Sequence, residues 1–344
     1  MLFAETDITN QSSFADRLRR MDIPGFAIPS VAYSPETDWQ FGVAAAGYFN
    51  ILGDSRKSYV WGDGAYSLNR QWYLNLATNL YIANRWLLSF KAGYRDYPDF
   101  YYGIGNVIDE HQTAIAYDSR RLSMSLQPQY RFGNTGWSAG VNWNLLMETT
   151  SLDSARVLMW GIGLVAQYDT RDEVYYPHEG MFFKTVASYY GQELGSTARM
   201  GEIQIDFRHF VPIYKEFIFA YQFVSQMAIG GHLPFQMLPT LGGQDLIRGV
   251  RRQMFRDNMM MALQAEFRFP IWSVVKGTVF AGMGDVYSFD DWRWTTPKIG
   301  YGLGLRASFN TAKVNVRFDV ARSNVNHSWK IDGWSFYLTC TEAF

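Results

Sequence analysis

Apolar and polar residues alternate one by one over three stretches in the last third of the chain. In the stretch 259–271 one face is apolar, whereas Gln264 and Glu266 lie on the other. The same alternation recurs at 299–309 and 314–320. Because successive side chains of a strand point to opposite faces of a sheet, each stretch is predicted to be a strand with one apolar face. Their repetition along one chain favours a transmembrane β-barrel.

Strand patterns begin near residue 28 and continue to the end of the chain without a composition shift or linker. We therefore predict an all-β chain with one antiparallel transmembrane barrel domain at 29–344, preceded by an N-terminal leader at 1–28. About sixteen strands are expected, an even number that is typical of single-chain bacterial barrels. They are predicted at 28–34, 41–48, 58–68, 73–82, 86–94, 122–130, 137–146, 157–168, 181–190, 201–210, 217–227, 259–271, 277–287, 299–309, 314–321 and 334–344.

Connection lengths give an independent prediction of orientation. Tight connections at 83–85, 133–136 and 311–312 are expected on one side, and long ones at 95–117, 230–258 and 289–298 on the other. Bacterial barrels have short periplasmic turns and longer external loops. A first strand that runs outward from the periplasm places every one of these connections on its expected side and both chain ends in the periplasm.

Composition agrees with a barrel and excludes several other classes. The chain is 48% hydrophobic and 17% aromatic, yet its mean hydropathy is slightly below zero, because only every second barrel residue faces lipid. No run of about 18 or more apolar residues occurs, which excludes a spanning helix. The net charge of −1 gives no reason to expect nucleic acid. The histidines and the single cysteine show no spacing typical of a metal or catalytic site, so no cofactor is expected.

The two chain ends carry localisation signals of different kinds. Residues 1–7 contain no apolar core of signal-peptide length, so we expect that an export signal has been removed. Helical spacing over 13–21 predicts a short amphipathic helix in the leader, either mobile or docked under or inside the lumen. At the other end, Phe336, Leu338 and Phe344 lie on a mostly apolar face that ends in an aromatic residue. This face resembles the terminal signal read by the bacterial outer-membrane assembly machinery.

Glycines gather on one face of two neighbouring strands, the same face as Glu266 by parity. They are Gly282, Gly284, Gly300, Gly302 and Gly304. Glycine permits close approach of another backbone, so a segment is expected to lie in this shallow trough. The 29-residue connection 230–258 is long enough to enter the lumen. An arginine carried in by it, Arg248, would meet Glu266 in a bidentate pair.

Motifs in this region resemble those of the Omp85 superfamily. Ile247, Arg248 and Gly249 are similar to the Arg-Gly motif of its sixth external loop. The stretch 266–270 resembles the strand that supplies the arginine's carboxylate partner. Phe280, with glycines two and four residues later, is similar to the Phe-x-Asp-x-Gly strand, although Gly282 stands at the aspartate position. A resemblance to the family's mid-barrel turn is found at Asp169, Arg171, Asp172, Pro177 and Gly180. Without the family, these residue types favour a charge cluster that stabilises a turn.

The resemblance spans roughly residues 29–344 and implies that external loop 6 folds back into the lumen. Ile247, Arg248, Gly249 and Glu266 would then form a loop-6 lock. Because glycine stands at position 282, only one carboxylate partner is expected for Arg248. Glu266 is therefore expected to carry most of the anchoring of the loop. Asp285 points outward by parity and is not expected to replace the missing aspartate.

Resemblance to the family also implies a function without covalent chemistry, and therefore no enzyme. The chain is expected to insert, assemble or translocate other polypeptides in the bacterial outer membrane, with a weakly paired seam between its first and last strands. Expected partners are outer-membrane lipids, unfolded or translocating polypeptide clients, and a periplasmic or outer-membrane protein. Only about 28 residues precede the first strand, so the family's client-binding (POTRA) domains are not expected in this short form, which is either a stand-alone member that acts with a partner or a barrel whose soluble domain was lost. Two alternatives stay open: a passive channel or structural barrel, and an outer-membrane hydrolase, for which no Ser/His/Asp ordering stands out.

Overall fold

Strands dominate the part of the chain that the computed structural model describes, residues 25–34, 37–51, 56–107, 114–153, 156–173, 176–272, 275–290, 297–308, 315–325 and 333–339. No helix in these ranges is long and apolar enough to cross a membrane. The strands are β1 (Gly25–Ser34), β2 (Asp38–Phe49), β3 (Ser58–Ser67), β4 (Trp72–Ile82), β5 (Trp86–Tyr101), β6 (Ile115–Arg131), β7 (Trp137–Thr150), β8 (Val157–Asp169), β9 (Gly180–Tyr190), β10 (Met200–Tyr214), β11 (Phe217–Ile229), β12 (Thr240–Leu241), β13 (Phe255–Arg256), β14 (Met259–Trp272), β15 (Val275–Tyr287), β16 (Lys298–Ser308), β17 (Asn315–Ser323) and β18 (Trp334–Thr339), with 3-10 helices η1 (Gln192–Leu194) and η2 (Phe235–Met237).

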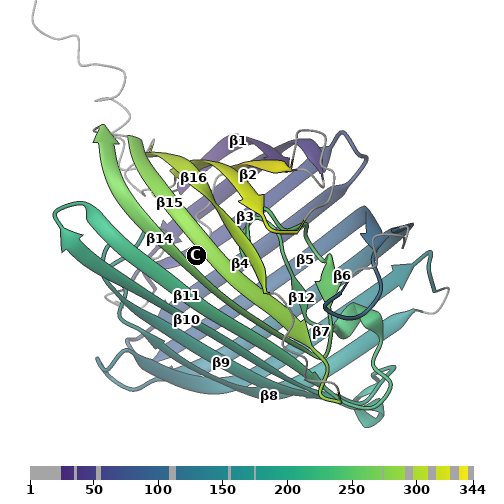
Figure 1. Cartoon of the computed structure of the whole chain (residues 1–344). Coiled ribbons are helices and arrows are strands. Elements are labelled where there is room, and N and C mark those ends of the chain that lie inside the picture. Colours follow the sequence, from purple (N-terminus) through teal and green to yellow (C-terminus); the bar gives the residue numbers. More distant parts are fainter. Residues whose placement is uncertain are drawn as a thin grey trace, which may run out of the picture.

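Sixteen of the described strands close into one antiparallel barrel, which confirms the predicted fold class. Each barrel strand pairs with its neighbour along the chain, β11 pairs with β14, and β1 pairs with β18 to complete the ring. Figure 1 shows β1 beside the yellow C-terminal strands at this closure. The remaining strands, β12 and β13, form a small sheet of their own within the connection 230–258.

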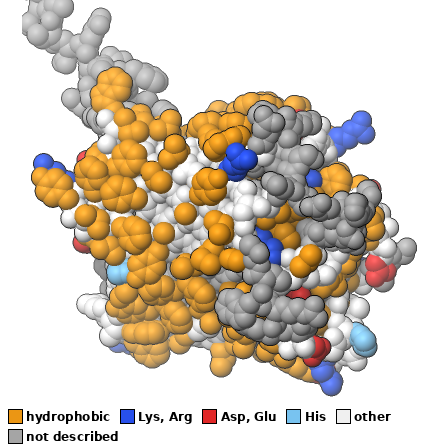
Figure 2. All heavy atoms as spheres, viewed as in Figure 1, with side chains coloured by type: hydrophobic (Ala, Val, Ile, Leu, Met, Phe, Trp, Pro, Cys, Tyr) orange, Lys and Arg blue, Asp and Glu red, His pale blue; other side chains and the backbone are white. Residues whose placement is uncertain are grey.

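The alternation along each strand separates the two faces of the wall. In β14, Leu263 is 47% exposed, whereas the next inner-face residues, Gln264 and Glu266, are 3% and 1% exposed. Because the sheet is closed, the apolar exposed face is the outer one and the polar face looks into the barrel. Figure 2 shows a face of the molecule on which hydrophobic side chains predominate. The wall therefore offers lipid a largely apolar surface and carries polar residues such as Gln264 and Glu266 inside.

β5 and β6 exceed their predicted ranges by the most. β5 continues beyond residue 94 to Tyr101, and β6 begins at Ile115 rather than at 122. The extension carries charged residues, and the paired positions Arg95 and Arg121 continue the register without interruption. Inner-face positions of a barrel accept charge, so the strands continue through these residues. The connection between them is thereby shortened to 102–114.

The connections keep the predicted alternation of sides. Since the strands are antiparallel, 83–85 and 132–136 lie at the end of the barrel where β1 begins, and 102–114, 230–258 and 288–297 lie at the opposite end. The turn at 83–85 is tight because Ala83 and Asn84 both adopt positive φ. The predicted leader helix, the turn at 311–312 and Phe344 lie outside the described residues.

The apolar outer face yields a stability prediction. Leu164 lies near the middle of β8 and is 67% exposed, so Leu164→Arg places a cation in the hydrocarbon region at a cost of about 2–4 kcal/mol. Ile213→Arg, near the end of β10, is the matched control and is expected to cost about 0–1 kcal/mol. The free energy of unfolding by urea in lipid vesicles measures both. Equal costs would contradict the assignment of this face to lipid.

Candidate functional site

The guanidinium of Arg248, in the connection between β11 and β14, lies between two carboxylates. Its Nη2 donates to Oε1 of Glu266 on β14 at 2.5 Å, and its Nη1 donates to Oδ2 of Asp319 on β17 at 2.8 Å. All three side chains are at most 1% exposed. Both carboxylates stand at inner-face positions of their strands. A guanidinium fork with charged acceptors forms hydrogen bonds about twice as strong as neutral ones.

An aromatic ring supports the same guanidinium from a third strand. The Arg248 Cζ lies 3.5 Å from the centroid of the Phe280 ring on β15. A desolvated guanidinium over an aromatic face gains about 2 kcal/mol or more. Arg248 is therefore held by residues of β14, β15 and β17 together.

The expectation of a single carboxylate partner is wrong. Asp319 supplies the second one from β17, in place of the family aspartate that is missing at Gly282. At Gly282 the space is taken by the loop instead, because a Cβ there would lie 3.0 Å from Cδ1 of Ile247. The sequence places Asp319 at a polar position of the alternating stretch 314–320. Alternation could not identify its partner, because Arg248 lies in a connection and not in a strand. Asp285, for its part, pairs with Lys298 at 2.6 Å.

Three further arginines join the two carboxylates, and sequence reasoning assigned them no role. Arg268 Nε donates to Glu266 Oε2 at 2.9 Å, and Arg306 Nη1 donates to Asp319 Oδ1 at 2.5 Å. Arg317 Nε lies 3.4 Å from Asp319 Oδ2. The side chains of these arginines are fully buried. The six residues, called here the Arg248 cluster, are Arg248, Glu266, Arg268, Arg306, Arg317 and Asp319.

Positive charge exceeds negative charge in the Arg248 cluster, which contains four guanidinium groups and two carboxylates. Arg306 and Arg317 even occupy directly paired positions on β16 and β17. Each carboxylate is shared between at least two arginines, so that no guanidinium is buried without a counter-charge beside it. Removing either carboxylate would leave several buried cations uncompensated, which is strongly destabilising.

Backbone contacts fasten the loop to the last two strands. The amide of Gly249 donates to the hydroxyl of Tyr337 on β18 at 3.1 Å, and the hydroxyl of Ser323 on β17 donates to the Gly249 carbonyl at 3.0 Å. Gly249 has a φ of +98°, and a Cβ there would lie 2.7 Å from the backbone carbon of Arg322. Only glycine meets both the conformation and the close approach.

The glycine trough divides into two parts in the structure. Gly300 and Gly284 face the loop, because a Cβ at Gly300 would lie 2.1 Å from the Arg248 carbonyl oxygen and one at Gly284 would lie 2.9 Å from Cδ1 of Leu241. Gly282 faces Ile247, as described above.

Gly302 and Gly304 instead leave room for side chains of the wall itself. A Cβ at Gly302 would lie 2.7 Å from the Phe280 ring, and one at Gly304 would lie 2.1 Å from Oδ1 of Asp319. The first part accommodates the loop backbone, and the second accommodates partners of the Arg248 cluster.

The loop also has a hydrophobic core where it meets the wall. Ile247 is fully buried in it, next to the arginine that the loop carries. The buried members of this core are Val224, Leu241, Ile247, Val250, Met254, Phe255, Met260, Ala262 and Val286. Apolar burial and the ion pairs therefore act on the same segment.

The predicted mid-barrel turn lies at the other end of the barrel, between β8 and β9. Arg171 Nε and Nη2 donate to the two carboxylate oxygens of Asp169 at 2.9 and 3.0 Å. Asp172 accepts the amide of His178 at 2.9 Å, and Gly180 has a φ of +103°. Pro177 is buried beside them. These side chains bind one another and the turn backbone.

On β18 the residues of the predicted terminal signal occupy the outer face. Phe336 and Leu338 alternate with Ser335 and Tyr337, which are buried on the inner face. Phe344 lies outside the described residues.

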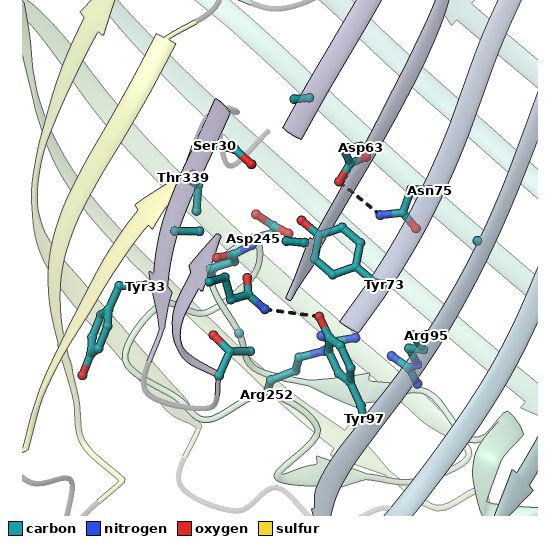
Figure 3. A pocket seen from close by; sticks show the side chains of 18 of the residues that line it. Ser30, Tyr33, Asp63, Tyr73, Asn75, Arg95, Tyr97, Asp245, Arg252 and Thr339 are labelled. Carbon is teal, nitrogen blue, oxygen red and sulfur yellow. Dashed lines mark hydrogen bonds between the residues drawn. The ribbon is translucent and has the colours of Figure 1, made fainter. Parts of the chain in front are cut away.

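A chamber of about 680 Å³ lies beside the closure of the barrel. Ser30 and Ala32 of β1 and Thr339 of β18 contribute to its wall, and residues 242–246 of the loop line it as well. Figure 3 shows Asp63 and Asn75 directed toward each other within this chamber, joined by a hydrogen bond of 3.4 Å. Within the described ranges, no group of three or more His, Cys, Asp or Glu residues could hold a metal ion.

Comparison with known proteins identifies one family. The sequence matches the Omp85 superfamily domain over residues 50–341. Comparison with curated proteins gives no match. Similar solved structures include BamA from Haemophilus ducreyi lacking POTRA domains 1-3, with a TM-score of 0.59, 12% identity, and coverage of 93% of this chain and 70% of that chain.

Two further similar structures are CdiB proteins. CdiB from Acinetobacter baumannii has a TM-score of 0.59 and 12% identity, over 92% of this chain and 59% of that chain. CdiB from Escherichia coli has a TM-score of 0.59 and 12% identity, over 92% of this chain and 62% of that chain. This chain thus spans less than two thirds of either CdiB. At this identity the likeness shows the shared barrel fold alone.

Removal of either carboxylate of the Arg248 cluster is expected to be costly. Glu266→Ala and Asp319→Ala each leave buried guanidinium groups without a counter-charge, and Arg248→Ala leaves both carboxylates short of a donor, so each change is expected to destabilise by about 3–5 kcal/mol. Urea unfolding in lipid vesicles measures the loss. Asp96→Ala is the control, because it breaks an exposed pair with Arg120 and is expected to cost about 0–1 kcal/mol. Cluster variants as stable as the control would contradict the shared burial of these charges.

Gly300→Ala tests the close approach of the loop. The added Cβ would lie 2.1 Å from the Arg248 carbonyl oxygen, so the loop must shift away from the wall. We expect faster proteolysis within 230–258 in the folded protein, followed by mass spectrometry of the fragments. Gly47→Ala is the control, since a Cβ at Gly47 meets nothing within 4 Å. Identical cleavage rates in the two variants would exclude the contact.

Proposed function

This chain belongs to the Omp85 superfamily, and from that premise we propose that it inserts or assembles outer-membrane proteins, or translocates polypeptides, with the help of a partner protein. Family and fold point to the bacterial outer membrane as its location. The proposed action is mechanical: a client segment pairs with an exposed strand edge and no covalent bond is made or broken.

The closure between β1 and β18 is the observation that carries this proposal. The first and last strands of the ring meet there, with Tyr33 opposite Leu338, and on its other side β1 pairs with β2 along its whole length. Pro29 in β1 has no amide hydrogen to donate. A strand with a proline in its interior hydrogen-bonds less completely to its neighbours, which favours an edge to which a client strand can add.

We further infer that the connection 230–258 acts as external loop 6 and folds into the lumen. Support comes from Arg248, which contacts inner-face residues of β14 and β17, and from Gly249, which contacts β17 and β18. In this proposal the loop holds the C-terminal side of the seam in place while β1 moves. The chamber beside the seam provides space for a client segment that enters there.

A disulfide across the seam tests the proposal. Tyr33→Cys with Leu338→Cys, in a Cys340→Ser background, joins directly opposed positions of antiparallel strands, where the spacing suits a disulfide. Oxidation is expected to stop insertion of an unfolded barrel client into vesicles prepared from native outer membranes, which retain partner proteins. Reduction is expected to restore it. The folded fraction of the client on SDS gels gives the measurement.

The matched control places the same bond on the firmly paired edge of β1. Val31→Cys with Phe41→Cys joins β1 to β2 through exposed positions of the same face and is expected to leave insertion unchanged. Unimpaired insertion with an oxidised seam would contradict opening at β1 and β18. A large, steady conductance of the purified protein in planar bilayers would then support a passive channel instead.

A further inference from the structure

An apolar groove of about 770 Å³ runs across the outer face of β14, β15 and β16. Ala265 and Ala281 are directly opposed on adjacent strands, and their short side chains leave the sheet uncovered between larger neighbours. Pale backbone is visible between the hydrophobic side chains on this face in Figure 2. The larger side chains that line the groove are Phe219, Phe267, Val279, Tyr301, Leu303 and Trp334.

The position of the groove identifies the kind of molecule that meets it. The groove belongs to the apolar outer face, so its surroundings in a membrane are lipid chains. Its volume lies in the range of about 300–1,000 Å³ that is typical of small-molecule sites. An acyl chain in the groove would contact the floor and both sides at once, whereas a chain on a flat wall contacts one side.

An exposed arginine stands at one end of the groove. Arg322 on β17 is directly opposed to Tyr301 on β16 and to Trp334 on β18, and its guanidinium lies 5.7 Å from the Trp334 ring centroid. Among the described residues the Arg322 side chain makes no hydrogen bond or ion pair, whereas the exposed Arg120 is paired with Asp96. A guanidinium fork beside an apolar groove complements a phosphate group joined to an acyl chain.

We propose that the groove and Arg322 form a binding site for an anionic, phosphate-bearing lipid. The acyl chain occupies the groove over Ala265 and Ala281, and the phosphate pairs with Arg322. Arg322 is near the end of β17 at which the long connections lie, so the lipid belongs to the leaflet on that side. The site includes Trp334 of β18 but neither β1 nor the seam pair Tyr33 and Leu338, and it requires no polypeptide client.

Photolabelling in vesicles tests the site. The protein is reconstituted in phosphatidylcholine vesicles that contain phosphatidylglycerol with a diazirine on its acyl chain, and labelled peptides are mapped by mass spectrometry. Labelling is expected to concentrate on peptides that cover 263–283. Ala281→Leu fills the groove and is expected to reduce this labelling several-fold. Ala92→Leu adds the same bulk on the outer face of β5, outside the groove, and is expected to leave it unchanged.

The charge is tested by comparing lipids. Diazirine phosphatidylcholine is expected to label the groove about fivefold less than phosphatidylglycerol, which corresponds to about 1 kcal/mol for one arginine. Arg322→Gln is expected to abolish the difference, and the control Arg120→Gln to preserve it.

Folding is checked by gel mobility without heating, and only the folded species is analysed, with Ala265→Leu as a second groove variant. Uniform labelling around the barrel wall would overturn the groove. A preference for phosphatidylglycerol that survives Arg322→Gln would overturn the role of the arginine.

Discussion

The buried pairing of Arg248 with Glu266 and Asp319 is the interaction on which the rest of the site depends. A loop of this length pays a large entropy cost to occupy one position, and neither its short internal sheet nor its hydrophobic core specifies which strands it meets. The guanidinium fork does, because it must reach carboxylates on β14 and β17 at the same time. Once it is placed there, the loop backbone follows the wall at Gly300.

Because its contacts fall on the C-terminal strands, the loop is attached to one side of the barrel closure. Gly249 binds residues of β17 and β18, which precede the closure with β1. β1 is tied in full register to β2 instead. The barrel can thus be regarded as two sets of strands, each with its own reinforcement, which meet at the closure of β1 with β18. This division is what makes an opening at the seam physically reasonable without disruption of the rest of the sheet.

The architecture could be predicted from sequence because alternation is a local property. The residues of a strand such as β14 are enough to identify its apolar and polar faces, and the number of strands follows from how often this alternation recurs along the chain. Contacts between strands are different. Parity alone places Glu266, Arg306 and Asp319 on polar faces, yet their meeting depends on the curvature of the wall and the register of four strands. The extension of β5 to Tyr101 was not predicted, since it contains charged residues. Charged residues are typical of the end of a strand in a soluble sheet, whereas the inner face of a barrel accepts them.

Small residues on both faces make the wall between β14 and β16 unusually thin. Gly300 leaves its inner side open to the loop backbone, and Ala265 and Ala281 leave its outer side almost bare. Over this patch the loop and the hydrocarbon phase are separated by little more than the peptide backbone. Changes in bilayer thickness or composition would therefore reach the loop through the sheet backbone rather than through packed side chains, so the membrane itself would influence how closely the loop lies against the wall.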